Sequence, residues 1–268
     1  MEPLSRGRST TQPRLECDGE TATLEQVWAL DLSPSGHFTA MQVRGRRTLG
    51  IDFHLDRLDA ATRELFDVGL DGDRVREYIR HALADDIDDA SVRVNVFRRN
   101  AAADVSVMIG VRPPAPTPAD PQKLLPVDYM RPRAHIKHAS GFGQGYFAGL
   151  AQANGFDEAL FVGPDGRIAE GSITNIGFVS GDEIVWPEAP RLDGVMMRVL
   201  QRELDRSHIS WRSAPVRIED VSSLDGAFVT NSRGFASVAR IGELEFPTDA
   251  ALSRTARQLL AAAPYDPI

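Results

Sequence analysis

The stretch Asp157-Glu-Ala-Leu-Phe-Val-Gly-Pro-Asp-Gly-Arg-Ile-Ala-Glu-Gly-Ser-Ile-Thr-Asn-Ile176 decides the fold of this chain. Its apolar start predicts a strand over 157–163, Pro164-Asp-Gly166 predicts a turn, and a second strand is expected over 173–180. An acid, Glu170, follows the turn and precedes a glycine. Three small residues with hydrogen-bonding side chains come next, Ser172, Thr174 and Asn175. Such side chains can fix a carboxylate and a polar ligand at a domain cleft, although spacing alone favours a β-hairpin with polar turn residues.

Upstream of this stretch, the chain contains only two lysines, Lys123 and Lys137. Lys137 stands in His135-Ile-Lys-His-Ala-Ser-Gly141, just before a glycine-rich segment. Arginine cannot lose its proton or form an imine, whereas lysine does both when its environment lowers its pKa. Lys137 is therefore a candidate for covalent chemistry, and an ordinary surface lysine is the simpler alternative.

Three further segments carry groups suited to an anion. Arg57, in His54-Leu-Asp-Arg-Leu58, offers a planar guanidinium that matches phosphate. Leu192-Asp-Gly-Val-Met-Met-Arg198 opens a helix, and a helix start presents free backbone amides. Val229-Thr-Asn-Ser-Arg-Gly234 ends a strand in hydrogen-bonding side chains. Each segment has an ordinary alternative: a surface arginine, a helix start capped by Asp193, and a polar turn.

Hydrophobic periodicity predicts a mixed chain of strands and helices. In the first part, strands are expected over 26–30, 37–43, 91–97 and 104–110, and helices over 52–62 and 73–84. In the second part, strands are expected over 124–129, 157–163, 173–180, 211–216, 227–230 and 235–241, and helices over 144–154, 194–207 and 253–262. This mixture places the chain in the α/β (α+β) class.

The clearest boundary is Pro113-Pro-Ala-Pro-Thr-Pro-Ala-Asp-Pro121. Five prolines in nine residues cannot continue a helix or a central strand and favour an extended linker. The domains are therefore expected to be a poorly ordered tail (1–18), an N-terminal α+β domain (19–112), a proline-rich linker (113–122) and a larger C-terminal domain (123–268).

Charge and composition limit the classes of partner. The 268-residue chain has a formal net charge of −8, which argues against nucleic acid because that partner usually needs a basic patch. There is no run of about eighteen apolar residues, so no membrane-spanning helix is expected. The start, MEPLSRGRSTTQPRLE, lacks the apolar core of a secretory signal. The single cysteine, Cys17, cannot form an internal disulfide, and the cytoplasm is the expected location.

Taken together and in order, these motifs resemble the class IV aminotransferases, the fold type IV group of pyridoxal-5′-phosphate (PLP) enzymes. That group includes branched-chain and D-amino acid aminotransferases and aminodeoxychorismate lyase. The resemblance runs from about Phe38 to Ile241 and is strongest over 157–176, with matches also in the His-Leu-Asp-Arg-Leu and Ile-Lys-His blocks. It implies a two-domain fold with the cofactor in the cleft between the domains, usually in a homodimer.

The resemblance also implies a role for individual residues. Lys137 would carry PLP as a Schiff base and later move the proton, and Glu170 would pair with the pyridine nitrogen and support the ring as an electron sink. The cofactor phosphate would be held by one guanidinium, two backbone amides and one hydroxyl. These belong to Arg57, Val195, Met196 and Ser232.

Several positions depart from the family pattern. Many transaminases carry an acid and a threonine in place of Thr39 and Ala40, and Met196 stands where a small hydroxyl residue is common. Phe142 replaces a frequent tyrosine near the cofactor hydroxyl. Thr39 and the Ile-Lys-His run are somewhat closer to the lyase branch.

Three functions follow as hypotheses. The first is transamination between an amino acid and a keto acid; the second is elimination of pyruvate from aminodeoxychorismate to give 4-aminobenzoate. The third is a family member that has lost catalysis and serves as a binding or structural protein. The expected substrates are small molecules. Candidate contacts for a substrate carboxylate are Arg93, Arg98, Arg131 and Arg133.

Overall fold

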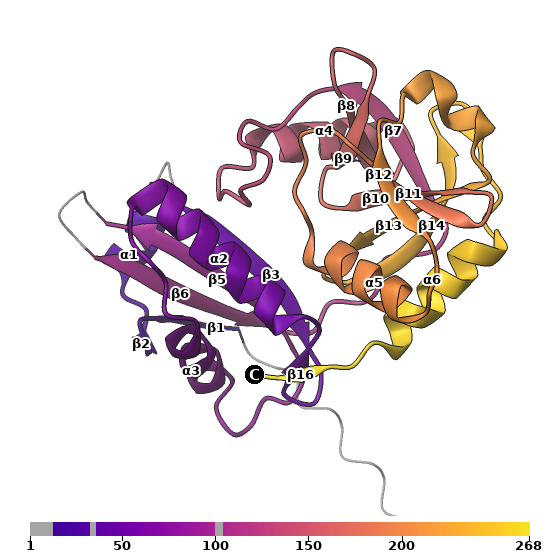
Figure 1. Ribbon diagram of the computed structural model, residues 1–268. Helices are drawn as coiled ribbons and strands as arrows, with labels where there is room; N and C mark the ends of the chain where they lie inside the picture. The colour runs from indigo at the N-terminus through magenta and orange to yellow at the C-terminus, as the bar shows by residue number, and fades with distance from the viewer. Residues whose placement is uncertain (1–12, 33–35, 100–103) are drawn as a thin grey trace, which may run out of the picture.

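The computed structural model describes residues 13–32, 36–99 and 104–268, arranged around two β-sheets (Figure 1). The first sheet has the strand order β2-β1-β6-β5-β3 and the second the order β12-β11-β10-β13-β14-β7-β8-β9. Residues 1–12 of the expected tail lie outside the described residues, whereas Arg14–Cys17 forms strand β1. The mixed α/β class agrees with the sequence.

The first sheet is antiparallel and carries helices on both faces. Its strands are β1 (Arg14–Cys17), β2 (Glu20–Thr21), β3 (His37–Val43), β5 (Ala90–Arg98) and β6 (Val105–Arg112). Helices α2 (Ile51–Phe66) and α3 (Gly72–Leu83) bury an aliphatic core on one face, and α1 (Leu24–Asp31) packs on the other. Because strand residues alternate between faces, β3 turns Phe38, Ala40 and Gln42 away from the core, towards the cavity described below.

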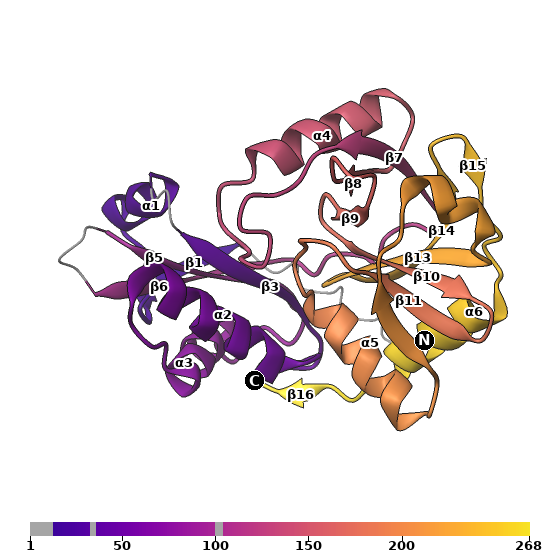
Figure 2. The same cartoon turned by 45° about the horizontal axis from the view of Figure 1, so that its top comes forward.

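The second sheet is mixed, curls, and is covered on two sides. Its strands are β7 (Gln122–Asp128), β8 (Glu158–Val162), β9 (Ile168–Gly171), β10 (Asn175–Ser180), β11 (Glu183–Pro187), β12 (Trp211–Ala214), β13 (Gly226–Asn231), β14 (Gly234–Ile241) and β15 (Leu244–Glu245). Helix α4 (Phe142–Ala153) lies on one side, and α5 (Val195–Arg206) and α6 (Ala251–Ala262) on the other (Figure 2). A short 3-10 helix spans Ile218–Ser223.

Direct contacts, besides the connection from β6 to β7, also join the halves. Gly50, at the start of α2, has φ +64°, and a Cβ there would lie 2.8 Å from Val199 Cγ2 of α5. The chain also ends on the first half, where β16 (Asp266–Pro267) pairs with β4 (Arg47–Thr48) (Figure 1). Asp266 accepts hydrogen bonds from the amides of Gly50 and Ile51, at 2.9 and 3.3 Å, and so caps α2.

One expected element is wrong in type. The strand predicted over 26–30 is part of helix α1, because Thr23 and Gln26 form a reciprocal capping box at its start. Within the described part of the chain, no helix is both long and apolar enough to span a membrane.

Candidate active site

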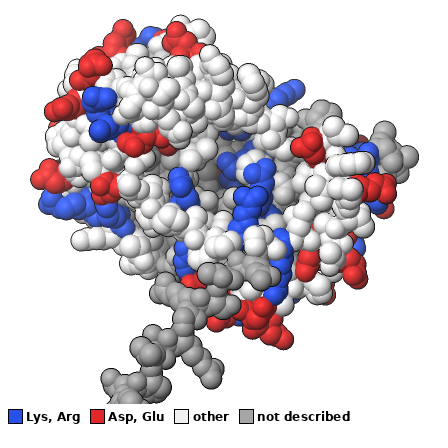
Figure 3. All heavy atoms as spheres, turned by 180° about the vertical axis from the view of Figure 1, so that it is seen from behind, with Lys and Arg blue, Asp and Glu red and all other residues white. Residues whose placement is uncertain are grey.

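A cavity of about 320 Å³ lies between the two sheets and receives residues from both halves of the chain. All six residues expected to bind the cofactor line it: Arg57, Lys137, Glu170, Val195, Met196 and Ser232. Figure 3 shows lysine and arginine side chains gathered around a hollow on one face of the molecule. The volume lies in the usual range for a small-molecule site.

Lys137 is placed by the loop between β7 and α4. Its carbonyl accepts a 2.8 Å hydrogen bond from the amide of Phe38, which ties this loop to β3, and its Nζ lies 5.0 Å from the centre of the Phe38 ring. Burial, together with the charges of Arg57 and Arg131, lowers the pKa of Lys137 to about 7. A substantial share of this amine is therefore neutral near pH 7, as attack on a carbonyl carbon requires.

Glu170, at the end of β9, is paired inside the protein. Its Oε1 lies 3.0 Å from Arg131 Nη1, with the two side chains only 6% and 4% exposed. The amide of Leu192 donates to Oε2 at 3.2 Å. Burial raises the pKa of Glu170, and Arg131 opposes that rise. A carboxylate so oriented suits a protonated ring nitrogen as its further partner.

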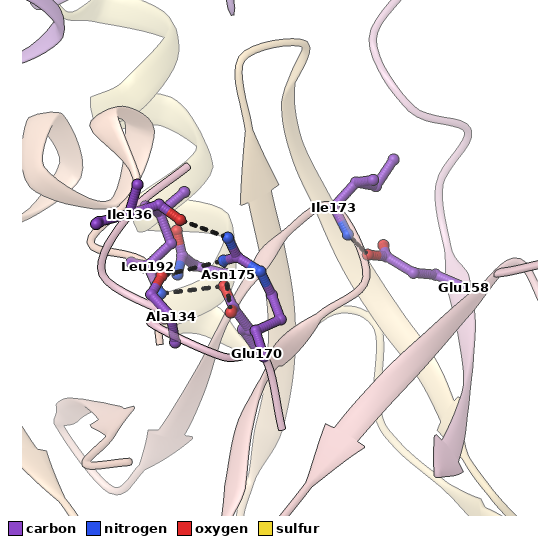
Figure 4. A network of polar contacts seen from close by, with 8 residues as sticks. Ala134, Ile136, Glu158, Glu170, Ile173, Asn175 and Leu192 are labelled. Carbon is purple, nitrogen blue, oxygen red and sulfur yellow. Dashed lines mark hydrogen bonds and ion pairs between the residues drawn. The ribbon is translucent and has the colours of Figure 1, made fainter. Parts of the chain in front are cut away.

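Arg131 clamps the loop that carries Lys137. Its guanidinium donates to the carbonyls of Ala134 and Ile136, at 3.1 and 2.7 Å, as well as to Glu170 (Figure 4). Because both terminal nitrogens of Arg131 bond to these partners, Arg131 positions the loop and Glu170. The expectation that it binds a substrate carboxylate is not supported by this arrangement.

The other three candidate arginines have different surroundings. Arg98 donates to the carbonyl of Phe66 at 3.0 Å, and Arg133 has a side chain 77% exposed beside Glu64; neither lines the cavity. Arg93 does line it. Arg233 lines it as well; it stands in the 229–234 segment but was not among the arginines expected from the sequence to contact a substrate.

The helix start at α5 is built for an anion. The expected alternative of a cap by Asp193 is wrong: the N-cap residue is Gly194, and no side chain bonds to the first turn. Asn175 fixes the segment that precedes the helix, because its side-chain amide donates to the carbonyl of Leu192 at 2.6 Å. A Cβ on Gly194 would lie 2.0 Å from Asn175 Oδ1, so only glycine fits at this position.

Arg57 faces the same region from α2. Burial and the charges of Arg198 and Arg131 lower its pKa to about 10, so it remains a cation at neutral pH. Arg57 Nη2 donates to Thr39 Oγ1, and Arg57 Nε is buried with no hydrogen-bond partner among the described residues. Ser232 follows β13 beside Arg233, whose amide donates to Asn231 Oδ1 at 2.8 Å.

Unpaired polar atoms test whether this region fits a phosphate. Five buried atoms of residues in the cavity wall have no partner among the described residues: Arg57 Nε, His54 Nε2, Thr230 Oγ1, Arg131 Nε and Gln144 Oε1. Buried polar groups are normally hydrogen-bonded, so such atoms indicate a polar ligand or ordered water. The atoms of Arg57, His54 and Thr230, together with the helix start of α5, match the oxygen-rich phosphate of PLP.

Glu158 is a buried residue that the sequence analysis did not single out. It accepts a hydrogen bond from the amide of Ile173 at 2.7 Å (Figure 4), and further bonds from Thr174 Oγ1 at 3.1 Å and from Ser172 Oγ at 3.3 Å. Burial raises its pKa to about 7, and these bonds oppose the rise. The hydroxyls of Ser172 and Thr174, which were expected to hold a ligand, therefore bond to Glu158 and shape the cavity wall. The sequence did contain one indication of Glu158: it is an acid at the start of an otherwise apolar strand.

The departures from the family pattern lie in different places. Ala40 lines the cavity, whereas Thr39 is fully buried and contacts Arg57 and His54. Met196 lies in the first turn of α5, and Phe142, on α4, is 85% exposed. Phe142 is therefore not a wall residue of this cavity.

Comparison with solved structures shows the fold. A branched-chain aminotransferase from Thermoproteus uzoniensis with norvaline shares 16% identity and a TM-score of 0.82, over 92% of this chain and 93% of that one. A candidate 4-amino-4-deoxychorismate lyase from Legionella pneumophila shares 18% identity and a TM-score of 0.78, over 87% and 92%. The PLP-bound form of a hypothetical aminotransferase from Mycobacterium tuberculosis shares 20% identity and a TM-score of 0.76, over 85% and 88%.

Sequence comparison identifies the family. No curated protein matches the sequence. The family model for amino-transferase class IV matches residues 36–241, which include the whole cavity wall. The chain therefore belongs to the class IV aminotransferases, a family of PLP-dependent aminotransferases and lyases.

Proposed function

We propose that the protein is a PLP-dependent aminotransferase that moves an amino group between an amino acid and a keto acid. One observation supports this proposal above the others. A single cavity holds a lysine of lowered pKa, a buried carboxylate and an anion cup, formed by Lys137, Glu170, and the group of Arg57, Ser232 and the α5 helix start.

Each residue then has a defined task. Lys137 Nζ would hold the cofactor covalently and, once substrate is bound, would take and return the proton of the substrate Cα. Glu170 would keep the pyridine nitrogen protonated, while Arg131 fixes the direction of its carboxylate. The cup would hold the phosphate. When bound, PLP supplies the electron sink for the reaction.

Aminodeoxychorismate lyase is the second candidate, and it uses the same residues for its first steps. One observation favours it: Ala40 lines the cavity beside Thr39, where many transaminases carry a threonine and an acid, respectively, and the resemblance places Thr39 closer to the lyase branch. A non-catalytic role is less well supported, because Lys137, Glu170 and Arg57 share one cavity.

The substrates would be small carboxylic acids, and two arginines are placed to receive them. Arg93 lies with its guanidinium carbon 3.5 Å from the centre of the Phe38 ring, and its Nε donates to Asn95 at 2.9 Å. The side chain of Arg233 forms no ion pair or hydrogen bond with another described residue. Both cations are therefore available to substrate carboxylates, in place of Arg98, Arg131 and Arg133.

We also propose that the protein is a homodimer in the cytoplasm, with neither nucleic acid nor membrane as a partner. Helix α4 has no charged residue along its 12 positions, and it exposes Phe142 and Tyr146 by 85% and 59%. A second copy of the chain is the occupant we propose for this apolar face, and sedimentation analysis would show a dimer. The net charge of −8 disfavours phosphate-backbone partners.

An amino-donor screen tests the reaction. Each donor is added to the purified holoenzyme, and the absorbance of the cofactor is followed. Conversion to the pyridoxamine form would establish half-transamination, whereas pyruvate release from aminodeoxychorismate without that conversion would establish the lyase. A protein that binds no PLP would refute both and leave the binding role.

A further inference from the structure

His54 is a buried histidine in the cavity wall that the proposed reaction does not use. It lies on α2 one turn before Arg57, and residues three apart share one face of a helix. Its side chain is 1% exposed. Helix α2 begins beside α5, since a Cβ on Gly50 would lie 3.1 Å from Val195 Cγ1. His54 therefore lies on the stretch of α2 that runs from the α5 helix start to Arg57, along the anion cup.

The hydroxyl of Thr39 determines which nitrogen of His54 carries the proton. Thr39 Oγ1 accepts a hydrogen bond from Arg57 Nη2 and lies 2.6 Å from His54 Nδ1. Thr39 is fully buried, and among the described residues no other acceptor contacts its hydroxyl. A hydroxyl has one proton to donate, and leaving it unpaired in the interior is costly. Thr39 therefore donates to Nδ1, and the proton of the neutral ring lies on Nε2.

The ring is neutral, with Nε2–H as a free donor. Burial, and then the charges of Arg57 and Lys137, lower the pKa of His54 well below its usual value. Nε2 is buried and has no hydrogen-bond partner among the described residues. Because native proteins rarely leave such a donor unpaired, its partner is a group that enters the cavity.

We propose that His54 Nε2–H donates a hydrogen bond to the phosphate of the cofactor. A phosphate brings several acceptor oxygens, which Arg57, Ser232 and the helix start share with it. A neutral donor adds a hydrogen bond without adding positive charge next to Lys137, whose own proton is already disfavoured by Arg57. Arg57 thus acts twice, directly on the anion and through Thr39 on the tautomer of His54. The inference rests on cofactor binding alone and holds for an aminotransferase or a lyase.

The test measures binding and not turnover. In the Lys137→Ala background no covalent bond masks the phosphate contacts, and absorbance titration gives the affinities for PLP and for pyridoxal, which lacks the phosphate. His54→Asn keeps an amide next to Thr39 but removes the donor at Nε2. We expect PLP affinity to fall about ten- to a hundredfold, and pyridoxal affinity to change less than about threefold.

Two further variants separate the hydrogen bond from a packing effect. His54→Gln, whose amide nitrogen reaches the position of Nε2, should recover most of the PLP affinity. Thr39→Val should weaken PLP binding even if His54→Asn fails to fold, because the proton is no longer held on Nε2. The control is His81→Asn on α3, whose side chain is 61% exposed. Unchanged PLP affinity in His54→Asn, or an equal loss for PLP and pyridoxal, would overturn the proposal.

Discussion

The amine of Lys137 is harder to charge in the folded protein than in the unfolded chain, because burial and Arg57 lower its pKa from 10.5 to about 7. Between these two pH values the unfolded chain binds a proton at Lys137 that the folded chain does not. The free energy of unfolding of the apoprotein therefore rises with pH across this window. The loss of stability caused by burying the charged amine is complete below about pH 7 and absent near pH 10.5.

Lys137→Met should remove this loss of stability. In the absence of cofactor we expect the variant to gain about 1–3 kcal/mol in free energy of unfolding at pH 6, and nothing near pH 10.5. Urea unfolding at several pH values measures the difference. Lys123→Met is the matched control, because Lys123 is the other lysine of the chain and is exposed. A gain that is independent of pH would show that packing and not charge is responsible.

Glu170→Gln tests the carboxylate. The amide keeps one acceptor oxygen, which can accept from Arg131, and it loses the bond from the Leu192 amide, which in Glu170 goes to the other oxygen. Since only one hydrogen bond is lost, the variant should fold and bind PLP with its usual absorbance. It cannot hold a positive charge on the ring nitrogen, so kcat should fall at least about a hundredfold. The control is Glu183→Gln, whose partly exposed carboxylate pairs with Arg212. Turnover within about threefold of the parent would leave Glu170 with a structural role only.

At this scale the sequence indicated the candidate chemical groups of the cavity but not the residues that position them. Lys137 was singled out because lysine is scarce, and Glu170 because it lies in a dense motif. Arg131 gave no such signal: its bond to Glu170 spans 39 positions and exists only after two strands and a loop have met. His54 and Glu158 were missed for the same reason, since their function depends on partners brought by the fold.

Among the elements, the start of α5 has the strictest steric requirement. In Gly194→Ala the new Cβ would lie 2.0 Å from Asn175 Oδ1, so the amide must turn away or the helix start must shift. Either change moves the first-turn amides relative to Arg57. We expect PLP affinity at least about tenfold lower by absorbance titration, since a charge-assisted hydrogen bond contributes about 1.5–3 kcal/mol.

Gly149→Ala provides the control for this substitution. Gly149 lies within α4, and a Cβ there would meet no atom within 4 Å. Alanine favours a helix interior over glycine by about 1 kcal/mol, so this variant should be at least as stable as the parent. If both substitutions left PLP affinity unchanged, the α5 start would not be part of the phosphate site.

Helix α1 shows where local patterns mislead. Residues 26–30 alternate as a strand does, yet Thr23 and Gln26 close a capping box that starts a helix. The remaining expected helices, over 52–62, 73–84, 144–154, 194–207 and 253–262, correspond to α2–α6 with shifted ends. These longer elements carry a clear apolar face, whereas α1 buries no residue fully and its pattern is weaker.

At the scale of the molecule, the sequence predicted two domains but not how they meet. The return of the C-terminus as β16 pairs residues more than two hundred positions apart, and no local pattern announces such a contact. The packing of Gly50 against α5 is equally nonlocal. These contacts set the distance between Arg57 and the groups of the second half, and therefore the size of the cavity.

Because the phosphate cup takes Arg57 from the first half and the α5 start and Ser232 from the second, the cofactor should tie the halves together. A ligand that binds only the folded state stabilises it by mass action, so PLP should raise Tm, and tighter binding should raise it further. Arg57→Ala removes a charge-assisted contact. In the Lys137→Ala background we expect it to weaken PLP binding about ten- to a hundredfold and to reduce the gain in Tm. Arg63→Ala, on the same helix with a side chain 65% exposed, is the control. Equal affinities in the two variants would remove Arg57 from the phosphate site and confine the cofactor to the second half of the chain.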